Sequence, residues 1–131
     1  MKLLLDTHIW LWSRMQPDRL SSRVAKALVE RHNELWISPI SIWEILLLCR
    51  KRRLVLEGGP EAWISTALAK VPFREALLTH EVALATESIV LPHGDPADCF
   101  LAASAKVYGL TLVTADRNLV SGKGYSTLAN R

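Results

Sequence analysis

The chain has 131 residues, half of them hydrophobic, which is enough for one domain with a sizeable core and too few for two separate cores. Sixteen Lys and Arg against thirteen Asp and Glu give a net charge of +3, which by itself selects no partner. The composition excludes a disordered chain, and the isolated Cys49 and Cys99 exclude a disulfide framework. No apolar stretch is long enough to span a membrane. We therefore expect a single cytoplasmic domain over residues 1–131.

Short apolar segments alternate with segments of helical pattern in the first half of the chain. The run Lys2–Leu5 ends at Asp6 and predicts a buried strand. A second strand is expected at Leu35–Ser38, followed by Pro39, a residue favoured at the first position of a helix. The expected helices cover residues 8–15, 21–31 and 39–50, the last one running into a basic segment.

The second half of the chain continues this alternation. The clearest strand is expected at Leu110–Thr114, and a further one within residues 73–78. A polar exit follows the strand at 115–118, and the tail from 121 to 131 carries no clear pattern. The expected helices cover residues 61–70, 79–87 and 97–108. Strands that alternate with helices predict an α/β fold with a parallel sheet, and ligands gather at the carboxyl ends of such strands.

Two carboxylates stand at predicted strand ends. Asp6 follows the first strand and Asp116 follows the last clear one. A structural role is open to both, since Asp6 fits the cap of the next helix and Asp116 fits a turn before Arg117. A metal ion at the edge of the sheet is the functional alternative.

A third carboxylate, Glu44, lies on a helical face that it would share with Ile40, Leu47 and Leu48. We expect it to be largely buried, which costs several kcal/mol unless the charge is paired or bound to a metal. The alternative to a metal ligand is a buried partner for an Arg side chain or for a Trp indole N–H.

Two further acids, Asp95 and Asp98, flank Pro96 at the start of a predicted helix. Capping accounts fully for Asp95 and only in part for Asp98, which could also point into a cleft. Clustered carboxylates repel one another unless a hard divalent cation such as Mg²⁺ or Mn²⁺ joins them. A site of this kind supports hydrolysis of a phosphodiester, and the chain has no serine-hydrolase or nucleotide-loop motif that competes for the role.

With these acids in this order, the chain resembles the PIN-domain ribonucleases, in particular the VapC-type toxins of bacterial type II toxin–antitoxin systems. The resemblance covers nearly the whole chain and rests on four segments, Leu3–Trp12, Ser38–Ile45, Asp95–Ala105 and Leu110–Asp116. It implies one PIN-like domain, with a parallel sheet of about five strands flanked by helices. The implied activity is Mg²⁺- or Mn²⁺-dependent hydrolysis of RNA by the toxin of a toxin–antitoxin pair.

The resemblance also implies roles for individual residues. The metal-binding and catalytic acids are implied to be Asp6, Glu44, Asp98 and Asp116. Glu44 either completes the cluster or orients the attacking water. The residues implied around them are a secondary acid, Asp95, and two site-lining hydroxyl residues, Thr7 and Thr114. Cys99 departs from the pattern, because relatives tend to have Arg there, and any contact of that Arg is absent.

Substrate and partners are also expected from this resemblance. The basic run Arg50, Lys51, Arg52 and Arg53 follows Glu44 on its helix. These cations either stabilise the helix C-terminus or bind RNA phosphates. Trp12 and Trp43 are the tryptophans best placed for a groove, and the four His show no ligand spacing.

The implied partners are a second copy of the chain, as a homodimer, and an antitoxin whose C-terminal segment covers the active-site groove. Two other functions stay open. One is a nuclease of the same chemistry acting on DNA or flap structures, and the other is a non-catalytic binding module with this fold.

Overall fold

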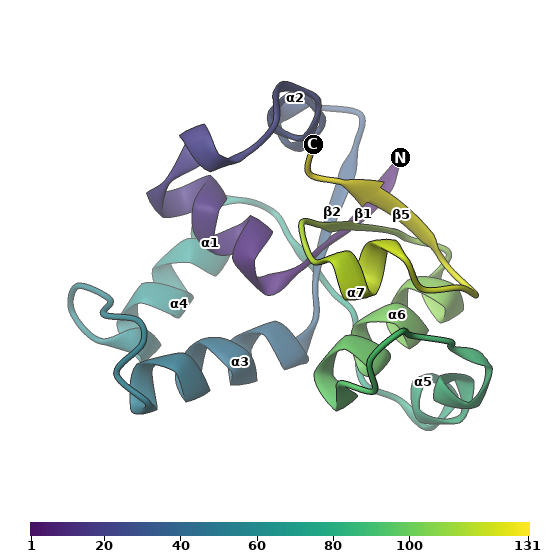
Figure 1. The fold of residues 1–131 in the computed structure, drawn as a ribbon. Coiled ribbons are helices and arrows are strands. Elements are labelled where there is room, and N and C mark those ends of the chain that lie inside the picture. The colour runs from purple at the N-terminus through teal and green to yellow at the C-terminus, as the bar shows by residue number, and fades with distance from the viewer.

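A five-stranded sheet with all strands parallel organises the protein, as seen in a computed structural model that describes residues 1–131. The strand order is β3-β2-β1-β4-β5, so the first strand of the chain lies at the centre (Figure 1). The strands are β1 (Lys2–Leu5), β2 (Glu34–Ile37), β3 (Arg74–Glu75), β4 (Thr111–Thr114) and β5 (Ser126–Ala129). The α/β class and the parallel five-stranded sheet are therefore confirmed.

Seven α-helices connect and flank these strands (Figure 1). They are α1 (Thr7–Met15), α2 (Ser22–Val29), α3 (Pro39–Arg50), α4 (Pro60–Lys70), α5 (His80–Ala85), α6 (Pro96–Tyr108) and α7 (Arg117–Val120). Short 3-10 turns follow α1 and α5, at Pro17–Arg19 and Thr86–Ser88. None of the helices has the length and apolar character needed to cross a membrane.

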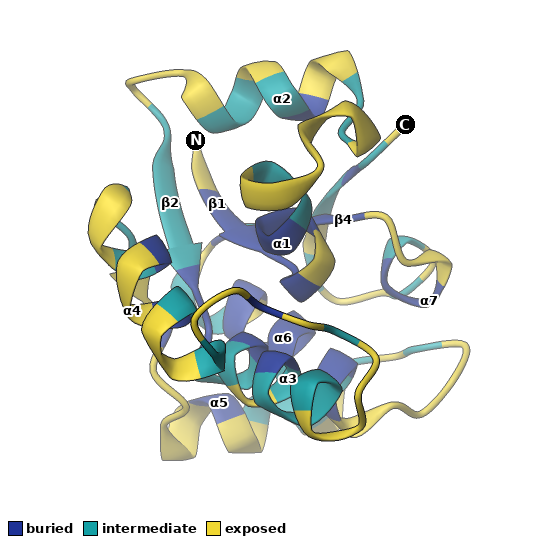
Figure 2. Ribbon diagram, turned by 90° about the vertical axis from the view of Figure 1, so that its left-hand side faces the viewer, coloured by how far each residue is buried: buried dark blue, intermediate teal, exposed yellow.

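The central strand is buried on both faces, as its continuous apolar run predicts. Leu3 and Leu5 point into a core shared with α1 to α4, and Leu4 points into a second core shared with α6 and β4. Figure 2 shows the buried stretch of β1 running into the buried start of α1. Because both faces of β1 are covered, packing fixes the position of Asp6, which follows β1 at the carboxyl end of the central strand.

Two parts of the chain differ from the sequence-based expectation. The strand expected within residues 73–78 has only two residues, Arg74 and Glu75, because it pairs with β2 alone at the edge of the sheet. The polar exit expected at 115–118 leads into a short helix, α7, and the weakly patterned tail at 121–131 holds a strand, β5, which pairs along its whole length with β4. The polar side chains of Ser126 and Thr127 suit such an edge strand and leave no apolar alternation to detect.

Candidate active site

Four carboxylates come together where β1 and β4 end. Asp6 directly follows β1, Asp116 lies two residues beyond β4, Glu44 is on α3, and Asp98 is in the first turn of α6. Burial, and then repulsion from neighbouring carboxylates, raises the pKa of Glu44 and of Asp98, with Asp6 and Asp116 acting on both of them. The four implied acids therefore belong to one electrostatic cluster.

Asp6 is nearly buried, with 7% of its surface exposed, and it uses both carboxylate oxygens. Oδ1 accepts from the backbone N–H of Thr7 (2.7 Å), which caps α1, and Oδ2 accepts from the Thr114 hydroxyl (2.7 Å). Burial raises the pKa of this carboxyl, and these hydrogen bonds oppose the shift. The capping interpretation of Asp6 is thus correct and leaves each oxygen a further lone pair for a ligand.

Glu44 is only half-buried, so the expectation that it is largely buried is wrong. Its face of α3 opens onto a groove instead of packing on the sheet, which relieves the desolvation of the charge. Its partner is neither Arg nor indole: the Thr7 hydroxyl donates to Oε1 (2.6 Å). Burial, and then the negative charges of Asp6, Asp95 and Asp116, raise its pKa.

Asp98 is buried at the start of α6, and its pKa is also raised. Its pKa rises to about 7 because of burial and then the charges of Asp95, Asp116 and Asp6, while a hydrogen bond from Asn118 opposes the rise. The Asn118 Nδ2 group donates to Asp98 Oδ2 (2.9 Å) and also to the His93 carbonyl (3.1 Å). This nearly buried amide is thus a site residue that sequence reasoning assigned to a polar exit.

Asp95 and Asp116 are exposed and cap helices. Asp95 Oδ1 accepts from the backbone N–H of Asp98 (3.1 Å) at the start of α6, as expected, and Asp116 Oδ1 accepts from that of Asn118 (2.9 Å) at the start of α7. The turn expected at Asp116 is in fact this short helix. Both acids keep a second oxygen free of hydrogen bonds within the protein.

The donor chemistry of this cluster fits a hard divalent cation, since it offers carboxylate and hydroxyl oxygens and no soft ligand. No Lys or Arg forms an ion pair with any of these acids. As the side chains lie, however, no three acidic, imidazole or thiol groups form a set that could hold a metal ion. The residues present therefore supply suitable oxygens, and closing around a cation requires side-chain rotation.

An open groove of about 530 Å³ lies beside the acids, between α3 and the start of α6. Glu44 and Asp95 line its acidic end, and Trp43, with 52% of its surface exposed, lies on α3 in the same wall. Lys51 and Arg53 line the groove as well, whereas the other two residues of the basic run, Arg50 and Arg52, do not.

Three other residues singled out in the sequence lie close by. Trp12 lines a smaller adjoining hollow, where the Arg19 guanidinium stacks 4.3 Å from its ring centre. His8 lines both hollows, although its spacing predicts no role, and its charge lowers the pKa of Asp6. The partly buried Cys99 thiol lies 3.9 Å from the Thr86 carbonyl oxygen, and burial raises its pKa.

The chain matches the family model of the PIN domain over residues 3–123. It is 34% identical over 122 residues to Ribonuclease VapC22 of Mycobacterium tuberculosis, which covers 91% of this chain and 90% of that protein. Among solved structures, it is similar to VapBC2 from Rickettsia felis bound to a promoter DNA fragment, with a TM-score of 0.72, 14% identity and 98% of both chains covered. DNA-bound VapBC from Salmonella typhimurium matches with a TM-score of 0.70 and 16% identity, again over 98% of both chains. These structural matches show the fold alone.

Proposed function

This chain belongs to the PIN-domain family, and we propose that it is a divalent-metal-dependent endoribonuclease, the toxin of a toxin–antitoxin pair. The observation that carries the proposal is the cluster of Asp6, Glu44, Asp98 and Asp116 without a Lys or Arg partner, at the carboxyl ends of the strands of a parallel sheet. Clustered carboxylates without a counter-charge destabilise a fold, so their presence at one site favours a ligand that offsets their charge.

In the proposed mechanism Asp6, Asp98 and Asp116 hold Mg²⁺ or Mn²⁺. The bound cation supplies Lewis-acid stabilisation of charge on the scissile phosphate and lowers the pKa of an attacking water. Thr7 and Thr114 fix the Asp6 carboxylate, and Asn118 orients Asp98.

Glu44 has the role of orienting the water and accepting its proton. The Thr7 hydroxyl holds Oε1, which leaves Oε2 for the water. The raised pKa of Glu44 improves it as a proton acceptor, because a base works best when its pKa approaches the working pH. Asp95 adds negative charge beside the cluster.

The proposed substrate is RNA, with backbone phosphates bound by the exposed Lys51 and Arg53 of the groove. The proposed partner is an antitoxin that covers this groove, and the solved relatives named above are VapBC complexes. We further propose that residues 1–131 form a single domain, that it is a homodimer and that it acts in the cytoplasm.

The test is cleavage of RNA by the purified protein with Mg²⁺ or Mn²⁺, beside EDTA, Asp6→Asn and Asp98→Asn samples. Loss of several kcal/mol of transition-state stabilisation predicts a rate lower by about a thousandfold in either variant. Asp18→Asn, the same change at an exposed acid in the 3-10 turn after α1, is the matched control and retains full activity.

Other outcomes point to the other functions. Faster cleavage of single-stranded DNA of the same sequence favours a DNA or flap nuclease. Absence of cleavage, together with no Mn²⁺ binding by calorimetry to the folded protein, favours a non-catalytic module.

A further inference from the structure

A second cavity, of about 500 Å³, lies on the β4 and β5 side of Asp6, whose hydrogen-bond partner Thr114 lines it. It is formed by the end of β4, by α7 and by the last residues of the chain. The residues that give it its chemistry are Thr114, Arg117, Ser121 and Arg131. It shares no residue with the groove beside α3.

A chain of hydrogen bonds connects the two hollows through the acids. Glu44, in the wall of the groove, accepts from the Thr7 hydroxyl (2.6 Å), and the Thr7 backbone N–H donates to Asp6 (2.7 Å). The other oxygen of Asp6 accepts from the hydroxyl of Thr114 (2.7 Å), which lines the second cavity. Glu44 and Asp6 therefore connect the groove with the second cavity, and α3 and α7 flank the start of α1 in Figure 1.

Two positively charged side chains line the second cavity. Arg117 and Arg131 are exposed and make no ion pair, since the single ion pair of the molecule joins Glu34 to Arg74. The wall beside them is ordered by hydrogen bonds: Asn130 accepts from the Ser21 backbone N–H (2.7 Å) and donates to the Arg19 carbonyl (2.9 Å). Two free guanidinium groups on an ordered wall suit a phosphate group.

We propose that this cavity binds a backbone phosphate of the RNA strand, on the opposite side of the acids from the groove. The inference rests on the proposed ribonuclease function and deepens it. A strand bound at both hollows passes over Asp6 and Asp116, so its scissile phosphate is held from two sides. Lys51 and Arg53 bind on one side, and Arg117 and Arg131 bind on the other.

The experiment measures binding of a fluorescein-labelled single-stranded RNA oligonucleotide in EDTA, by anisotropy, over a series of NaCl concentrations. For a single strand, each lost phosphate contact reduces the magnitude of the negative slope of log affinity against log salt by about 0.7. We expect this decrease for Arg117→Ala, about twice the decrease for the Arg117→Ala/Arg131→Ala double variant, and a wild-type slope for Arg117→Lys.

The matched control is Arg31→Ala, which removes the same charge from an exposed turn before β2, at the amino end of the strands and on the other side of β1 from β4. Equal slopes for Arg117→Ala and Arg31→Ala, in a protein that binds RNA, overturn the inference and leave the ribonuclease proposal intact. Absence of RNA binding by the wild type overturns both. A small-anion site is indicated instead if inorganic phosphate stabilises the wild type but not Arg117→Ala, while the RNA slopes stay equal.

Discussion

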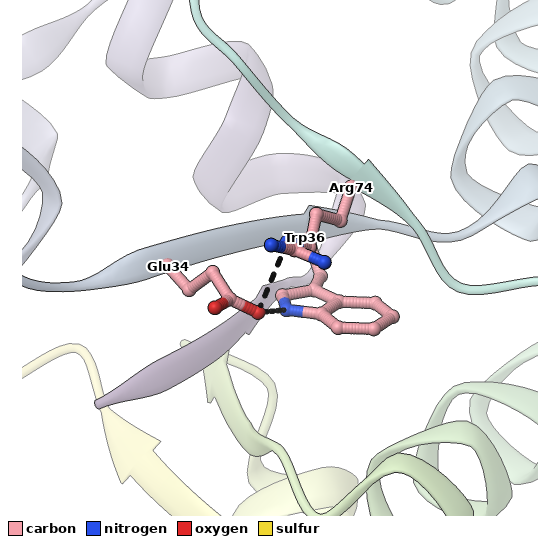
Figure 3. A network of polar contacts seen from close by, with 3 residues as sticks. All are labelled: Glu34, Trp36 and Arg74. Atoms are coloured by element: carbon pink, nitrogen blue, oxygen red, sulfur yellow. Dashed lines mark hydrogen bonds and ion pairs between the residues drawn. The ribbon is translucent and has the colours of Figure 1, made fainter.

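At the β2–β3 edge of the sheet, opposite charges meet. Glu34 Oε1 accepts from the Trp36 indole N–H (2.8 Å) and lies 3.3 Å from Arg74 Nε (Figure 3). At the ends of β1 and β4, four carboxylates cluster with no Lys or Arg paired to them. The first network is complete within the protein. The second network has no Lys or Arg partner within the protein, which is the pattern expected of the proposed functional site and not of a structural contact.

The largest expected difference between the two networks is in how much a divalent metal ion stabilises the protein through each of them. A divalent cation at a hundred times its Kd adds about 2.7 kcal/mol to the free energy of unfolding. At about 4 °C per kcal/mol, this raises Tm by about 10 °C, and EDTA reverses it. Thermal unfolding with and without Mn²⁺ measures this shift. Glu34→Gln keeps the shift and Asp98→Asn loses most of it; an equal shift in both variants contradicts the assignment of the site.

Removal of Asn118 is the next effect in size. Asn118→Ala leaves Asp98 Oδ2 without its donor and breaks two hydrogen bonds to the His93 backbone, so we expect a loss of about 2 kcal/mol of stability. The pKa of Asp98 rises further, because the hydrogen bond that favoured its charged form is gone. Urea unfolding measures the stability, and an NMR titration of the Asp98 carboxyl measures the pKa. An unchanged pKa contradicts the role given to this amide.

Neutralising Asp98 is expected to stabilise the metal-free protein. Its pKa is about 7 in the folded chain against a reference of 3.8, so the folded state binds more protons between these values. The stability contributed by this group therefore falls as pH rises from about 4 to about 7. Asn at this position does not ionise, so we expect Asp98→Asn to raise the free energy of unfolding by an amount on the order of 1–2 kcal/mol at pH 8 and by less at pH 5.

Thermal unfolding in EDTA at the two pH values tests this gain, with Asp18→Asn as the control. A destabilised Asp98→Asn protein at pH 8 would show that the carboxylate is compensated within the chain.

The smallest expected effect concerns the network of Glu34, Trp36 and Arg74. Glu34→Gln removes an ion pair whose side chains are 64% and 33% exposed at Arg74 and Glu34, respectively. Such pairs contribute at most about 1 kcal/mol, so Tm is expected to fall by no more than about 4 °C and RNA cleavage to stay unchanged. Urea unfolding at low and high salt measures the contribution, which shrinks as salt screens the pair. A loss of RNA cleavage in Glu34→Gln would show that the Glu34 network also contributes to activity, which contradicts its structural role.

Local patterns predicted much of the fold. The bounds of β1 agree with the apolar run Lys2–Leu5, and Pro39 begins α3 as its residue type favours. The C-terminal β5 escaped prediction because its order comes from pairing with β4 and from contacts of Asn130 with the chain near Arg19. Helix α7 escaped it because Asn118 bonds to His93 and Asp98, on another segment of the chain. The hydrogen bonds of Asn130 with Ser21 and Arg19 span 109 and 111 positions of the chain, and no local pattern predicts them.

The sequence by itself determined which acids stand at strand ends and helix starts, because side-chain period and capping preferences act over a few neighbouring residues. Only the tertiary structure decided how far those acids are buried, which hydrogen bonds they make and how their pKa values shift. The half-buried state of Glu44, the support of Asp98 by Asn118 and the cavity at Arg117 all arise where distant segments pack together. Desolvation and charge repulsion depend on that packing, so the pKa shifts and the second cavity follow from the folded chain and not from its order of residues.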